Sequence, residues 1–233
     1  MHAIDRDSMV NDIWLGLAVK ATTNLSPSLE FWHDDSGAPP YDYNPELAMQ
    51  MLDEAGWVVG DDGIRAKDGV RLAWTCAIIA GDQARRPLAE AAQQWFGQIG
   101  GQMEIQEQTS VTSSVRDHLT EMGLQNWAYG GDGGEPDATG VLHSDYTSER
   151  THYSNPEMDR LLEAGLAETD PGARREIYAQ VQQLFCEDVP VLYNMFWDWF
   201  VFMNPRIKGL PERDLLSGLS IYDLAHTFWI EEA

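Results

Sequence analysis

Basic residues, cysteines and long apolar runs are all scarce in this chain of 233 residues. Only 15 lysines and arginines stand against 38 aspartates and glutamates, which gives a formal net charge of −23. Nucleic acids and anionic membrane surfaces bind proteins through lysine and arginine, so this charge argues against both as partners. No apolar run reaches the length of about 18 residues that a membrane-spanning helix needs.

The two cysteines, Cys76 and Cys186, are far apart, and neither has a neighbour at zinc-site spacing. We therefore expect two buried thiols. The first residues of the sequence lack the charged, apolar and small-residue regions of a secretory signal, which by itself predicts a cytosolic protein. Hydrophobic residues make up 43% of the chain, enough for a substantial core in one large domain or two small ones.

Three predicted helices share one start signal, an asparagine or aspartate followed directly by proline. Such a side chain can cap a helix, and proline suits the first helical position because its missing N–H has no partner there. Apolar residues then recur at intervals of three or four, as on the buried face of a helix. A fourth apolar stripe, without this start signal, follows Gln83. The predicted helices cover residues 44–56, 83–97, 156–168 and 171–187.

Short apolar stretches between these helices predict strands. Two turn sequences, Asp61-Asp62-Gly63 and Lys67-Asp68-Gly69, flank a predicted hairpin. The other expected strands cover residues 71–79, 103–108, 125–129 and 191–202. Strands that alternate with helices are typical of layered folds, so we predict an α/β protein with a mixed sheet.

Residues 130–137 are the most unusual stretch of the sequence, and we call them the glycine segment. The segment reads Gly130, Gly131, Asp132, Gly133, Gly134, Glu135, Pro136 and Asp137. Glycines allow a close approach of the backbone to a ligand, and the segment follows a predicted strand, where open α/β sheets bind ligands. Its carboxylates suit an ammonium group, although an acidic surface turn would have the same composition. Trp127 and Tyr129, just before it, are candidates for the wall of a cleft.

Other chemistries find less support in the residue types and their spacing. Calcium prefers oxygen ligands such as those of Asp132 and Asp137, but the spacing is not that of an EF-hand, and we predict no metal site. A glycoside hydrolase would use two of these carboxylates, or Asp198, as acid and base, yet nothing fixes a pair at the required separation. The six histidines are scattered, and no nucleophile elbow or phosphate loop occurs. The sequence therefore contains no motif that predicts an enzyme, and no cofactor is expected.

Seven short motifs resemble a known family, the extracytoplasmic solute-binding proteins of the peptide, nickel and oligosaccharide class that serve ABC importers. The matching stretches are Ala3–Arg6 (AIDR), Gly16–Ala18, Tyr43–Trp57, Gly63–Gly69, Tyr129–Asp137, Tyr153–Asp159 (YSNPEMD) and Glu187–Pro190 (EDVP). Each motif alone is weak, but seven in the family's order are specific. The resemblance covers about residues 3–209, nearly the whole chain, and only the C-terminal part of the family's pattern.

The resemblance implies the periplasmic-binding-protein-like II fold, in which two lobes close on a ligand by a hinge motion. Residues 1–205 would be the C-terminal ligand-binding lobe, and residues 206–233 a tail that returns to an N-terminal lobe lying upstream. The implied function is the non-enzymatic capture of peptides or related solutes for delivery to the permease subunits. The implied location is extracytoplasmic, in a periplasm or at the cell surface with a lipid anchor. In that case, the lack of a secretory signal in the first residues says nothing about the compartment of the protein. A carboxylate-dependent hydrolase and an acidic interaction domain are the alternatives.

The resemblance also implies a role for the glycine segment. In the dipeptide-binding members, the aspartate of the corresponding loop pairs with the ammonium group of the ligand, and Asp132 occupies that place. A buried contact between a carboxylate and an ammonium group contributes on the order of 1.5–3 kcal/mol. The residues implied in ligand binding are Asp132, Tyr129, Trp127, Gly130, Gly131 and Gly133.

One departure from the family's pattern concerns the ligand carboxylate. The arginine that binds it in dipeptide binders has no counterpart here, because Ile78 or Ile79 stands in that region. Arg85 and Arg86 belong to the start of a predicted helix and need not reach the cleft. Longer peptides, oligosaccharides and other cationic solutes therefore remain open as ligands.

Overall fold

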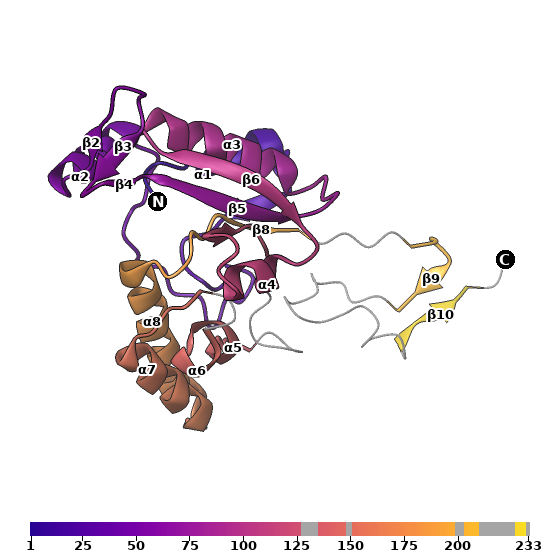
Figure 1. The fold of residues 1–233 in the computed structure, drawn as a ribbon. Coiled ribbons are helices and arrows are strands. Elements are labelled where there is room, and N and C mark those ends of the chain that lie inside the picture. Colours follow the sequence, from indigo (N-terminus) through magenta and orange to yellow (C-terminus); the bar gives the residue numbers. More distant parts are fainter. Residues whose placement is uncertain (127–134, 148–150, 199–202, 210–226, 232–233) are drawn as a thin grey trace.

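The computed structural model describes residues 1–126, 135–147, 151–198, 203–209 and 227–231 of the chain (Figure 1). In this part of the chain, a small parallel sheet and its helices form one half of the body, and a group of helices forms the other (Figure 1). No described helix is long and apolar enough to cross a membrane.

The parallel sheet has three strands in the order β6-β5-β7. Its strands and neighbouring helices are β5 (Ala73–Ile79), α3 (Arg86–Gln98), β6 (Gln102–Gln108), α4 (Val111–Arg116) and β7 (Met122–Gly123). β5 pairs with β6 along its whole length, and α3 makes the crossover that parallel neighbours require. A Cβ on Gly123 would collide with Val111 and Val115, so only glycine lets α4 lie this close to β7.

A three-stranded antiparallel sheet precedes the parallel one in the chain. Its elements are α2 (Pro45–Glu54), β2 (Val58–Val59), β3 (Arg65–Lys67) and β4 (Val70–Arg71). Arg65 fixes this sheet to its surroundings: its side chain is 3% exposed, pairs with Asp53 and donates to the carbonyl oxygens of Trp57 and Ile99, each at 2.8 Å.

The helical half contains the largest buried cluster of the described residues. Its helices are α5 (Thr139–Leu142), α6 (Ser144–Thr147), α7 (Pro156–Ala167) and α8 (Pro171–Asp188). Met158 and Leu162 of α7 and Tyr178 and Phe185 of α8 are fully buried between these helices. α7 and α8 approach closely at Gly165, where a Cβ would lie 2.8 Å from Cζ of Tyr178.

Two antiparallel strand pairs join distant parts of the chain. β1 (Ala18–Lys20) pairs with β8 (Met195–Trp197), and β9 (Ile207–Lys208) pairs with β10 (Trp229–Ile230). The pair β9-β10 lies apart from the body (Figure 1). Before β1, the chain forms α1 (Arg6–Ser8) and the π-helical turn η1 (Met9–Ile13).

The predicted helices are confirmed, because their start signals act locally. Asn44, Asn155 and Asp170 each accept a hydrogen bond from a backbone N–H in the first turn of the helix that follows. The predicted α/β class is confirmed as well, with parallel and antiparallel pairing in separate sheets. Cys76 and Cys186 are buried free thiols, as expected.

Three boundaries were predicted wrongly. The strand expected at 125–129 is instead β7 at Met122–Gly123, and its residues 127–129 lie outside the described part. The strand expected at 191–202 covers only Met195–Trp197 of the described residues, because β1 offers three residues to pair with it. α3 begins at Arg86 rather than Gln83, because the side chain of Asp82 accepts the N–H groups of residues 84 and 85 and forms a turn.

Candidate functional site

The candidate site is built around the C-terminal edge of the parallel sheet, where the chain leaves β5 and β7. Arg85 follows β5 and precedes α3, and Asn126 follows β7. The guanidinium of Arg85 pairs with Asp82 and donates a second hydrogen bond to Oδ1 of Asn126. Open α/β sheets bind ligands at this edge. The two loops are therefore joined by a charged side chain at the place where a ligand is expected.

The Arg85 guanidinium also lies against an aromatic ring. Its Cζ lies 5.0 Å from the ring centroid of Trp197 on β8, within range of a cation–π contact. The ring of Trp14 lies against Trp197, with centroids 4.8 Å apart. Trp14 is held between the π-helical turn η1 and two left-handed residues, Leu15 (φ 55°) and Gly16 (φ 76°). Backbone strain of this kind is often found at functional sites.

Asp82 keeps this cluster charged. Its side chain is 10% exposed and receives hydrogen bonds from the backbone N–H groups of Ala84 (3.0 Å) and Arg85 (2.9 Å). Burial favours the neutral acid, but these hydrogen bonds and the Arg85 guanidinium outweigh it and lower the pKa of Asp82. The pair is therefore ionised at neutral pH.

A second arginine contacts Glu135, the first described residue of the glycine segment. Arg174 of α8 donates from Nη1 to Oε2 of Glu135 at 2.6 Å and from Nε to the carbonyl oxygen of Gly165 at 2.8 Å. Its Cζ lies 5.2 Å from the ring centroid of Trp32 and 5.4 Å from that of Tyr178. Burial acts to lower the pKa of Arg174, but the contact with Glu135 leaves it above its ordinary value.

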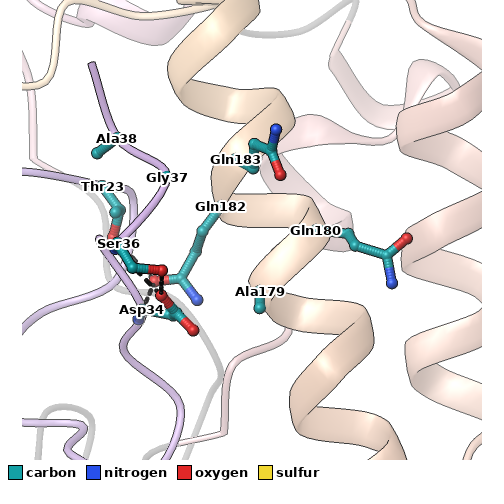
Figure 2. A pocket seen from close by; sticks show the side chains of 9 residues that line it. All are labelled: Thr23, Asp34, Ser36, Gly37, Ala38, Ala179, Gln180, Gln182 and Gln183. Carbon is teal, nitrogen blue, oxygen red and sulfur yellow. Dashed lines mark hydrogen bonds between the residues drawn. The ribbon is translucent and has the colours of Figure 1, made fainter.

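Two cavities of the described residues are lined in part by polar side chains. The first, of about 120 Å³, lies between residues 34–38 and α8 (Figure 2). Gln182 points into this region, yet its amide is fully used: Oε1 accepts from Thr23 and Asp34, and Nε2 donates to two carbonyl oxygens. The second, of about 210 Å³, is lined by Arg6, which donates to the carbonyl oxygens of Ala21 and Tyr41. The polar groups of Gln182 and Arg6 therefore bind other parts of the chain and connect distant segments of the fold.

Comparison with known proteins identifies the chain. The family described as bacterial extracellular solute-binding proteins, family 5, middle part, matches residues 1–150. The chain belongs to this family.

Individual curated proteins are also similar in sequence to this family 5 protein. The oligopeptide-binding protein AppA of Bacillus subtilis is 27% identical over 226 residues, which cover 91% of this chain and 41% of the relative. Protein XP55 of Streptomyces lividans is 30% identical over 214 residues, covering 89% of this chain and 38% of the relative. The family 5 chain thus spans about two fifths of the length of these curated relatives.

Solved structures confirm the predicted periplasmic-binding-protein-like II fold. NikZ of Campylobacter jejuni, in complex with Ni(L-His), aligns with a TM-score of 0.80 at 21% identity and covers 97% of this chain and 46% of its own. AppA of Bacillus subtilis, in complex with a nonapeptide, aligns with a TM-score of 0.80 at 23% identity and covers 99% of this chain and 46% of its own.

The structure changes the interpretation of the glycine segment in this family 5 protein. Of its three carboxylates, Glu135 pairs with Arg174, and Asp137 accepts the N–H of Thr139 at 2.9 Å at the start of α5. Both carboxylates therefore have structural partners, which removes them as a catalytic pair. Asp132 lies outside the described residues.

The predicted ligand residues themselves lie outside the described part of the chain. They are Trp127, Tyr129, Gly130, Gly131, Asp132 and Gly133. Of the two residues named for the region of the carboxylate-binding arginine, Ile78 is fully buried and Ile79 is exposed. Within the described residues, no three histidines, cysteines, aspartates or glutamates gather where they could hold a metal ion. Asp198, the other carboxylate considered for catalysis, is exposed at the end of β8.

Sequence reasoning did not single out Arg174, and it assigned Arg85 to the start of a helix without finding its contacts with Asn126 and Trp197. A signal for both exists in the sequence. Each stands at the N-terminal end of a helix, where the helix dipole disfavours a cation. A basic residue at such a position indicates a tertiary partner, and both arginines have one.

Proposed function

We propose that this family 5 protein is the substrate-binding component of an ABC importer and captures a peptide or a related small solute for the permease subunits. Its relatives include proteins named for binding oligopeptides, dipeptides and nickel. We infer from these names that the protein binds its solute without turning it over. The observation that carries the proposal is the cluster of Arg85, Asn126 and Trp197 at the sheet edge, directly before the glycine segment.

Within this proposal, Asp132 binds a positive group of the solute. The support is the place of Asp132 in the motif that resembles the family's loop, together with the acidic, glycine-rich composition of the segment. Trp127, Tyr129, Gly130, Gly131 and Gly133 would form the wall around the bound group. A carboxylate shielded from water binds an ammonium group through a charge-assisted hydrogen bond.

We further propose that residues 1–205 are one lobe of a two-lobed protein and that residues 206–233 belong with the other lobe. The pair β9-β10 supports this division, because it lies apart from the body and exposes Trp229 and Ile230. A two-stranded sheet alone is marginally stable in water, so a partner for its edges is expected. The protein would act outside the cytoplasm, in a periplasm or at a cell surface with a lipid anchor.

Calorimetric titration of the protein at its natural length tests the function. The probes are Ala-Leu, trialanine and a mixed pentapeptide library. We expect saturable binding of at least one probe and no hydrolysis, and we expect Asp132→Asn to weaken binding by about tenfold or more. The control is Asp61→Asn in an exposed turn, which should bind as the wild type does. Peptide turnover, or equal affinity in the Asp132→Asn variant, would contradict the proposal.

A further inference from the structure

A buried arginine lines the larger of the two cavities described above. Arg6 of α1 is 6% exposed, and the cavity beside it has a volume of about 210 Å³. Its guanidinium donates to the carbonyl oxygens of Ala21 and Tyr41, each at 2.6 Å, and to that of Tyr193 at 3.4 Å. These acceptors are far apart in the sequence, so several segments of the chain meet at this cavity.

The positive charge of Arg6 is not balanced by the protein groups around it. Its three acceptors are neutral carbonyl oxygens, and within the described part of the chain no carboxylate forms an ion pair with it. Burial lowers the pKa of Arg6, and the charges of Asp7 and Asp42 oppose this shift without cancelling it. A buried charge without a partner costs stability, so an anion in contact with the guanidinium would be favoured.

Donor groups remain for such an anion. A guanidinium has five N–H groups, and the three hydrogen bonds of Arg6 engage at most three of them. Thr22 lines the same cavity, and its hydroxyl is buried without a hydrogen-bond partner among the described residues. Lys20 of β1 adds a second positive charge to the lining, although its ammonium group also pairs with Asp7 at 2.8 Å. The lining therefore offers N–H and O–H donors together with positive charge.

Two carboxylates in the lining oppose an anion, but both are exposed to water. They belong to Asp35 and Asp42. Water screens exposed charges, whereas the guanidinium of Arg6 acts through the protein interior, where charges interact more strongly. The positive charge therefore dominates at the buried end of the cavity.

The volume of the cavity limits the size of the anion. Pockets that hold drug-sized ligands have volumes of about 300–1,000 Å³, so a cavity of about 210 Å³ is too small for a peptide solute. It has room for several water molecules and hence for a small ion. A carboxylate suits a guanidinium better than a halide does, because two N–H groups can bind its two oxygens.

We propose that this cavity binds a small oxyanion, such as acetate or bicarbonate, in contact with Arg6, Thr22 and Lys20. The anion balances the buried guanidinium and joins the segments that Arg6 holds together, so it stabilises the fold. This site does not rest on the proposed capture of a solute.

Thermal unfolding in acetate tests the proposal. Sodium acetate replaces sodium chloride at pH 7.5 and constant ionic strength, and acetamide serves as a neutral ligand of the same shape. At about ten times the dissociation constant of acetate, mass action predicts a rise of roughly 3–6 °C in the unfolding temperature. We expect acetate and bicarbonate to produce this rise and acetamide to produce none. An unfolding temperature that rises no more in acetate than in acetamide would overturn the proposal.

Matched variants locate the site, and Arg6 is left unchanged because its backbone contacts hold the fold. Thr22→Val removes the hydroxyl at the cavity, and Thr139→Val removes another buried hydroxyl without a described partner, at the start of α5. Lys20→Gln and Lys208→Gln each remove a lysine from a surface ion pair, and only Lys20 lines the cavity. We expect the acetate effect to shrink in the two cavity variants and to persist in the two controls. An undiminished effect in both cavity variants would overturn the proposal, because acetate would then act elsewhere.

Discussion

Gly165→Ala should destabilise the protein although it introduces a better helix former. In an exposed helix interior, alanine is favoured over glycine by about 1 kcal/mol. At Gly165 the new Cβ would lie 2.8 Å from Cζ, 2.9 Å from Cε2 and 3.0 Å from the hydroxyl oxygen of Tyr178. Real Cβ atoms essentially never approach other atoms so closely, so the ring or the helix must move.

The ring has little room to move. Tyr178 is fully buried, lies under the guanidinium of Arg174 at 5.4 Å and packs edge-on against Trp32 with centroids 6.1 Å apart. Overpacking of a tight core costs about 1–3 kcal/mol. A cost near the middle of that range, about 2 kcal/mol, exceeds the gain in helix propensity and leaves a net loss of about 1 kcal/mol.

Gly97→Ala is the matched comparison. Gly97 also lies in a helix, α3, but nothing stands within 4 Å of the position of its Cβ. Its substitution should therefore stabilise the protein by about 0.5–1 kcal/mol. In urea unfolding followed by circular dichroism, a slope of about 2–3 kcal/mol/M places the two midpoints about 0.5–1 M apart, on opposite sides of the wild type. A Gly165→Ala variant as stable as Gly97→Ala would refute the reasoning.

Three further predictions concern single side chains. Burial raises the pKa of the Cys76 thiol to about 11, so a disulfide reagent at pH 8 should leave it unlabelled in the native protein and label it in urea. Hydrogen bonds from the Thr75 hydroxyl and N–H lower the pKa of Glu121, so the carboxylate stabilises the fold above the unfolded pKa of about 4.3 and loses this effect as the pH falls. The stability difference between wild type and Glu121→Gln should therefore shrink between pH 6 and pH 3; a difference independent of pH would contradict this cause. Asp170→Ala removes the cap of α8 and should cost about 1 kcal/mol in urea unfolding, whereas no loss would show that the cap is replaceable.

Sequence alone predicted the features that depend on neighbouring residues. The start signals at residues 44, 155 and 170 work through hydrogen bonds that span two or three residues, and all three helices were found. The extent of β8 could not be predicted in this way, because its pairing depends on β1, a strand of three residues with no pattern of its own.

The site was predictable to a smaller degree. The sequence singled out the glycine segment, but not that Glu135 already has a partner 39 residues away in Arg174. The same limit applies to His143, one of the six scattered histidines, which follows the last residue of α5. It is 8% exposed, and its Nε2 lies 3.4 Å from Oε1 of Glu163. Contacts between distant residues decide which polar groups are available for a ligand.

Arg6 and β1 have a consequence for the order in which the chain folds. Arg6 donates to carbonyl oxygens of Ala21, Tyr41 and Tyr193, and β1 pairs with residues 195–197. Contacts of such sequence separation form late, because a long loop must close first. During synthesis, residues 1–20 therefore cannot form these contacts until Tyr193 and residues 195–197 have left the ribosome. The apolar side chains that the fold buries in this part of the chain, Ile4, Met9 and Val10, are exposed during this interval, which is therefore the stage at which a chaperone has most to protect.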